Sequence, residues 1–130
     1  MNTIISSATS GLLITLSNQY ANIVQDEHRT QMIENHQILY YFDVMHLCNG
    51  VLAGLVSVTS ASSNIELWAA AIIGLIGSMI YSACKKAIVR NEIDDPMDIT
   101  EVHGFCGIWS IIAVGIFDID KGLIYTGSMN

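Results

Sequence analysis

The chain has 130 residues, of which 52% are hydrophobic and only 13% are charged, and its formal net charge is −7. Because an average soluble domain is about 25% charged, this composition disfavours an ordinary soluble protein. The sequence contains no basic patch, which excludes nucleic acid as a partner.

The first predicted element is an apolar segment, residues 3–16, within a stretch from Met1 to Gln25 that contains no Asp, Glu, Lys or Arg. An α-helix needs about 17 to 25 apolar residues to cross a bilayer, so this segment is a short membrane span. It has neither the basic region nor the small-residue cleavage site of a secretory signal. We therefore treat it as part of the fold.

A polar insert, residues 17–43, follows this first span and contains several carboxylates. Part of it, residues 23–39, is a candidate for a surface helix. The insert ends in the aromatic cluster Tyr40-Tyr41-Phe42. Amphipathic rings gather at membrane–water interfaces, so we expect this cluster at the bilayer surface.

Three further membrane spans are predicted, at residues 44–59, 68–85 and 99–117. The stretches that carry them, residues 44–65, 67–84 and 102–117, contain no Asp, Glu, Lys or Arg. The first two stretches meet the length of about 17 to 25 residues for a bilayer crossing, and the third does so if residues 99–101 extend it.

The alternative to a membrane bundle is a soluble all-α domain with very apolar buried helices. Such helices need a polar face, and residues 67–76 offer none. The predicted fold class is therefore all-α, a polytopic bundle of about four membrane helices, because helices satisfy their own backbone in lipid. In the chain by itself, Ile, Leu and Val side chains of the last three spans should be broadly exposed.

The basic residues predict the orientation of the bundle. Alternating spans place Arg29, Lys85, Lys86 and Arg90 on one side of the membrane and Lys121 alone on the other. Loops rich in Lys and Arg face the cytoplasm. The connections that contain the first four residues are therefore predicted to be cytoplasmic.

Small residues recur at helical spacing along the spans. Gly50 and Gly54 form a GxxxG pair, and Gly104 and Gly107 lie three residues apart. Lipid provides no hydrophobic force between helices, so helices in membranes associate where small residues let their backbones approach. We predict that these four glycines pack against neighbouring helices.

The last span begins with a capping signature. Asp98 and Glu101 have the spacing of a capping box, and Pro96 discourages a helix that runs on from the preceding span. We expect Asp98 to accept hydrogen bonds from the amides of the first turn and Glu101 to reach back. Both carboxylates also suit the positive end of the helix dipole.

His103 is the residue of the spans most suited to chemistry. An ionisable side chain inside a membrane helix is by default a functional candidate, and imidazole can donate or accept hydrogen bonds near neutral pH. The alternative is a structural hydrogen bond to a neighbouring helix. Cys106 lies on the same face of the helix as His103, but two ligands do not make a metal site. We predict no metal, no cofactor and no enzymatic activity.

Several segments resemble the Amt/Rh family of ammonium transporters. Residues 48–56, CNGVLAGLV, are similar to one of its helices, and residues 68–74, WAAAIIG, to the following one. Residues 94–98, DDPMD, and 102–109, VHGFCGIW, closely resemble its most specific signature. The matching segments occur in the family order along nearly the whole chain.

The resemblance implies eleven membrane helices in two inverted halves, a homotrimer in the plasma membrane, and one ammonium or ammonia pore in each subunit. The chain corresponds to an incomplete second half, helices seven to ten. His103 matches the second of two pore histidines that share a hydrogen bond. Ile99 matches an apolar residue of the pore wall, and Asp98 an acidic residue near the cytoplasmic start of that helix.

Two functions remain open from the sequence. The chain is part of a conducting subunit whose other pore residues lie elsewhere, or it is a truncated, non-conducting membrane protein that associates with a full-length relative and modulates it. The partners implied are ammonium or ammonia and the lipid bilayer.

Overall fold

The computed structural model describes the backbone of residues 1–29 and 44–126 and the side chains of residues 1–20 and 44–125. Every regular element in these ranges is helical and none is a strand, which confirms the all-α prediction. The elements are α1 (Asn2–Arg29), α2 (Val44–Val58), α3 (Leu67–Arg90), the π-helical turn η1 (Thr100–Phe105), α4 (Cys106–Phe117) and α5 (Leu123–Thr126).

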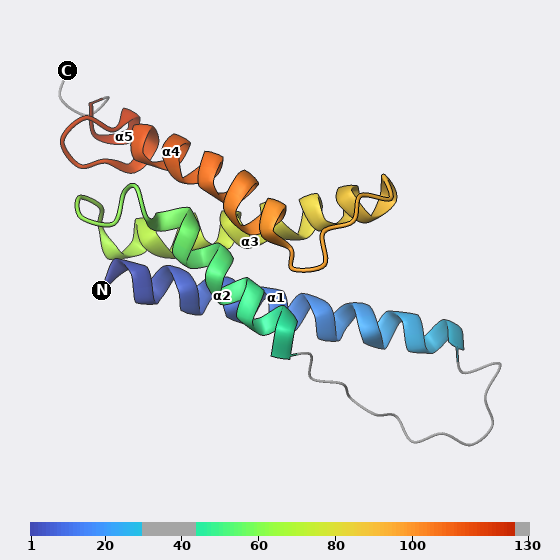
Figure 1. The fold of residues 1–130 in the computed structure, drawn as a ribbon. Helices are drawn as coiled ribbons and strands as arrows, with labels where there is room; N and C mark the ends of the chain where they lie inside the picture. The colour runs from blue at the N-terminus through green and yellow to red at the C-terminus, as the bar shows by residue number, and fades with distance from the viewer. Residues whose placement is uncertain (30–43, 127–130) are drawn as a thin grey trace.

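The long helices lie side by side and alternate in direction (Figure 1). The N-terminus, the α2–α3 connection and α5 lie at one end of the bundle, and the α3–η1 connection lies at the other. Both α1 and α4 pack against α2 and α3, but in the described part of the chain they make no contact with each other. The α2–α3 pair therefore forms the centre of the bundle, and α4 lies on its outer side.

Two of the predicted spans have the length and hydropathy to cross a membrane. They are Leu67–Arg90 and Thr100–Phe117. α2 is apolar but has only 15 residues, which at about 1.5 Å per residue is short of the roughly 30 Å hydrocarbon layer. The span predicted at residues 44–59 corresponds to α2, and the rest of the charge-free stretch 44–65 turns after Val58.

The first helix is longer than the predicted span. α1 continues past residue 16 and ends at Arg29, so the predicted polar insert begins as helix. The rest of the candidate surface helix and the aromatic cluster Tyr40-Tyr41-Phe42 lie outside the described residues.

Large apolar side chains remain exposed on the last three spans, as predicted. Leu52 is 43% exposed, Met79 64%, Ile108 59% and Ile111 70%. The buried residues are mostly small, with Ala53, Ala69, Ala70 and Ala113 fully inaccessible. Apolar surface of this extent marks contact with lipid or with another chain, so the described helices have an outer surface suited to a membrane bundle.

Candidate functional site

The close packing of α1 on α2 is made by serines and glycines. The Ser6 hydroxyl donates to the Gly54 carbonyl at 2.8 Å, and the Ser10 hydroxyl donates to the Gly50 carbonyl at the same distance. A Cβ added at position 54 would lie 2.6 Å from the Ser6 carbonyl oxygen. The backbones are therefore in direct contact, and interhelical hydrogen bonds of this kind join helices within lipid.

The other two glycines predicted to pack lie in a different environment. A Cβ at Gly104 would meet only the Thr100 side chain, at 3.9 Å, and one at Gly107 would meet nothing within 4 Å. Gly104 is exposed and Gly107 is half-buried. Their packing against another helix stays a prediction.

The inner face of α4 is fixed by polar contacts to α3 and to the turn that follows α2. The Trp109 indole donates to the Ile73 carbonyl at 3.2 Å, and the Ser60 amide donates to the Ser110 hydroxyl at 3.0 Å. Cys106 is fully buried beside Gly77 of α3. These contacts set the rotation of the helix and so decide which of its residues point outward.

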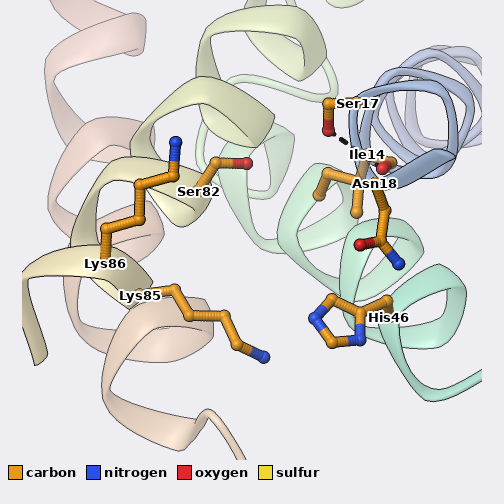
Figure 2. Close-up of a pocket in the computed structure, with 7 residues that line it drawn as sticks. All are labelled: Ile14, Ser17, Asn18, His46, Ser82, Lys85 and Lys86. Carbon is orange, nitrogen blue, oxygen red and sulfur yellow. Dashed lines mark hydrogen bonds between the residues drawn. The ribbon is translucent and has the colours of Figure 1, made fainter. Parts of the chain in front are cut away.

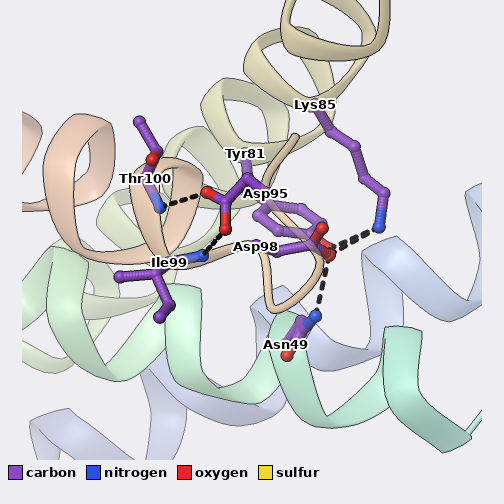
Figure 3. A network of polar contacts seen from close by, with 7 residues as sticks. All are labelled: Asn49, Tyr81, Lys85, Asp95, Asp98, Ile99 and Thr100. Atoms are coloured by element: carbon purple, nitrogen blue, oxygen red, sulfur yellow. Dashed lines mark hydrogen bonds and ion pairs between the residues drawn. The ribbon is translucent and has the colours of Figure 1, made fainter. Parts of the chain in front are cut away.

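A buried polar network holds the segment that leads into η1 (Figure 3). The Asp98 carboxylate accepts a hydrogen bond from the Asn49 amide of α2 at 2.8 Å and one from the Tyr81 hydroxyl of α3 at 2.6 Å. It also forms an ion pair with Lys85 at 2.5 Å. One carboxylate therefore joins α2, α3 and the start of the last span.

The backbone and charge of Asp98 are both adapted to this position. Its φ is 53°, in the left-handed region that Asp and Asn tolerate better than most residues. Burial raises the pKa of its carboxyl, but hydrogen bonds from Lys85, Tyr81 and Asn49 outweigh burial and hold the pKa below its ordinary value. Asp98 is therefore a charged acceptor.

The helix cap is made by Asp95, so the predicted capping role of Asp98 was wrong. The Asp95 carboxylate accepts from the Ile99 amide at 3.2 Å and from the Thr100 amide at 2.7 Å. Asp98 cannot do this because its side chain points away from the helix start, toward α2 and α3. The Thr100 amide also holds the pKa of Asp95 below its ordinary value.

Replacing Asp95 by alanine should loosen the start of η1 without unfolding the bundle, because the amides of Ile99 and Thr100 lose their acceptor. We expect amide hydrogen exchange at these two residues to become several-fold faster, while exchange in the middle of α3 is unchanged. Asp94→Ala in the same connection is the control and should have no effect. Unchanged exchange in the Asp95→Ala variant would contradict the assignment of this cap.

Glu101 does not reach back as the capping box requires. Glu101 is only 1% exposed, and its Oε2 atom is buried with no hydrogen-bond partner among the described residues. Buried polar atoms normally have a partner, so this unpaired oxygen is unusual.

Within the described residues, no three His, Cys, Asp or Glu side chains are grouped as a metal site would need.

His103 and Ile99 lie on the outer side of the η1–α4 segment. His103 is exposed and makes no hydrogen bond within the described part of the chain, and Ile99 is 55% exposed. Side chains four residues apart share a helix face, so Gly107 and Ile111 continue the same line. The result is an outward, mostly apolar stripe with one imidazole in it, which can contact a solute or another helix.

Tyr81 and Lys85 were not predicted as partners of Asp98. A signal was present, since the two residues are four apart on one helix and Lys85 is the first charge after a long apolar run. The capping role of Asp95 also had a signal, because Asp followed by Pro is typical of the first two positions of a turn.

Comparisons with known proteins agree with this architecture. Residues 1–129 match the model of the Ammonium Transporter Family. The chain is 45% identical over 78 residues to Ammonium transporter 3 of Dictyostelium discoideum and 36% identical over 77 residues to Ammonium transporter 1 member 4 of Arabidopsis thaliana. Each alignment covers 59% of the chain, and 18% and 15% of these relatives respectively.

The fold is also similar to crystal structures of mutants of Mep2 from Candida albicans. One mutant, delta442, superposes with a TM-score of 0.69 at 25% identity, over 95% of this chain and 30% of that one. A second gives a TM-score of 0.68 at 26% identity, over 90% of this chain and 22% of that one. The chain therefore spans less than a third of the length of either.

Proposed function

Because this chain belongs to the ammonium transporter family, we propose that it forms part of a subunit that conducts ammonium or ammonia across a membrane, with His103 on the pore wall. The membrane is the plasma membrane, and the complete subunit assembles as a homotrimer. The match to the family supports the choice of ammonium or ammonia as the substrate. The outward stripe of the η1–α4 segment supports the assignment of His103 to the pore wall.

The stripe has the properties that a conduction path for ammonia needs. Ile99 and Ile111 are more than half exposed, at 55% and 70%, and so can form an apolar wall once other helices surround them. His103 is the polar side chain between them. A small polar solute that leaves water must keep a hydrogen-bond partner, because an unsatisfied polar group in hydrocarbon costs several kcal/mol.

Neutral imidazole suits this role because one ring nitrogen accepts a hydrogen bond and the other donates one. His103 would accept from an N–H of ammonia or ammonium. Its second nitrogen would pair with a group from outside the described residues, since it has no partner within them. The Asp98 network and the Asp95 cap hold the helix start and so set the height of His103 along the path.

Replacing His103 by alanine in a complete subunit that contains this segment should lower saturable methylammonium uptake by about 10- to 100-fold, the equivalent of a lost hydrogen bond to a charged group. Uptake is measured in cells that lack their own ammonium transport. His28→Ala, in the predicted polar insert, is the matched control and should leave uptake near normal. Full uptake with unchanged selectivity in His103→Ala would remove the pore role.

The exposed apolar face of α4 also fits the second function, a non-conducting chain that docks on a full-length relative. Expression of the 130-residue chain alone separates the two. We expect no uptake from it, since its stripe would face lipid. If its co-expression lowers the uptake of a full-length relative, the modulating function is supported. Uptake by the chain alone would contradict both.

A further inference from the structure

A pocket opens between α1, α2 and α3 (Figure 2), and its lining includes neither His103 nor Ile99. Its volume is about 190 Å³. Every lining residue except one is polar, and the lining is Ile14, Ser17, Asn18, His46, Ser82, Lys85 and Lys86. Three helices thus contribute side chains to a single hollow.

The pocket carries positive charge and no carboxylate in its lining. Lys85 is engaged by Asp98, which lies outside the lining. Lys86 is exposed and has no ion pair within the described residues, so its charge is uncompensated there. The charge of Lys85 is neutralised by Asp98 and that of Lys86 is not, so the pocket carries a net positive charge and favours an anion.

Among the lining side chains, the Asn18 amide and the Lys86 ammonium offer hydrogen-bond donors for the oxygens of an anion. The Ser17 and Ser82 hydroxyls donate to carbonyls of their own helices. Figure 2 marks no hydrogen bond from the Asn18 amide to the other lining residues, so its two N–H groups are available. The Lys85 side chain extends from α3 toward His46 on α2 (Figure 2). The pocket therefore has the Asn18 amide on its α1 side and the two lysines on its α3 side.

The position of the pocket suggests the source of such an anion. Lys85 and Lys86 follow directly on the apolar run 67–84 of α3, which places them at the membrane surface on the side that the basic residues mark as cytoplasmic. Anionic lipids enrich that leaflet, and basic pockets between membrane helices bind their headgroups. We propose that this pocket binds a phosphate group, from the headgroup of an anionic phospholipid or from soluble phosphate.

The test uses the purified full chain in a neutral detergent and follows binding by native mass spectrometry or microscale thermophoresis. Short-chain dioctanoyl phosphatidic acid is titrated in one arm and inorganic phosphate in another, with dioctanoyl phosphatidylcholine as the zwitterionic reference. We expect the anionic lipid to bind, and Lys86→Gln to weaken that binding about fivefold, as the loss of one lysine near a charged membrane surface implies. Binding by inorganic phosphate as well identifies a soluble source, and binding by the lipid alone identifies the headgroup.

Arg90→Gln is the matched control, because it removes one positive charge from α3 one turn further on, outside the pocket. It should change the affinity less than twofold. Equal losses in the two variants would overturn the site in favour of diffuse surface charge, and so would equal binding of phosphatidic acid and phosphatidylcholine. The experiment measures binding and does not depend on ammonium transport. Its result therefore tests the pocket independently of the proposed function.

Discussion

Replacing Asp98 by alanine should lower the free energy of unfolding of the detergent-solubilised chain by about 3 kcal/mol, because it leaves a largely buried cation unpaired and puts alanine at a left-handed position. The carboxylate has three partners, on two helices, and all of them would lose an acceptor. The Lys85 side chain is 26% exposed, so partial hydration keeps the loss below that of a fully buried pair. Thermal unfolding followed by circular dichroism measures the change.

Two control variants separate the contributions of charge and backbone. Asp98→Asn keeps a residue that tolerates φ near 53° but removes the negative charge. It should therefore lower the free energy of unfolding, but by less than Asp98→Ala does. Asp94→Asn removes a charge from an exposed position in the same connection. It should stay within about 0.5 kcal/mol of the parent, as most surface changes do. A similar stability of Asp98→Ala and Asp94→Asn would show that the network does not hold the bundle.

The network also gives the stability of the chain a dependence on pH. The folded-state pKa of Asp98 lies below its unfolded value, so its contribution is fully present above the unfolded pKa of about 3.9. It is lost as the pH falls through the folded pKa. Asp98→Asn should therefore remove part of the acid destabilisation below about pH 4.

Replacing Gly54 by alanine should destabilise the α1–α2 pair by about 1 to 3 kcal/mol, because it overpacks a site with no free space. The added Cβ would lie 2.6 Å from the Ser6 carbonyl oxygen and 2.9 Å from the Ser7 Cα. Both are backbone atoms, so the helices must separate to accept it. That movement would also stretch the Ser6 hydrogen bond to the Gly54 carbonyl.

Gly115→Ala is the matched control for this change, since a Cβ there meets nothing within 4 Å. Alanine is favoured over glycine in a helix by about 1 kcal/mol, so this variant should be unchanged or more stable. The two substitutions therefore have opposite expected signs. A Gly54→Ala variant as stable as Gly115→Ala, measured by thermal unfolding, would mean that α1 and α2 are not in backbone contact.

The sequence by itself determined the fold class and the position of the helices along the chain. Long stretches without Asp, Glu, Lys or Arg have no polar face, so helices in lipid are the structure they allow. It also singled out His103, Asp98 and the GxxxG pair of Gly50 and Gly54, because an imidazole, an acid and closely spaced glycines are conspicuous in apolar surroundings. It did not determine the end of the first helix, since α1 continues from residue 16 to Arg29.

Only the tertiary structure decided what the polar residues at the last span do. Asp95 and Asp98 are both acidic and close to the same helix start, and spacing alone assigned the cap to Asp98. The contacts reverse that assignment, because Asn49, Tyr81 and Lys85 reach Asp98 from two other helices. The pocket at Lys86 has the same origin, since its residues come from three helices. A single helix specifies which residues share its face, but the neighbours of that face are set by packing between helices.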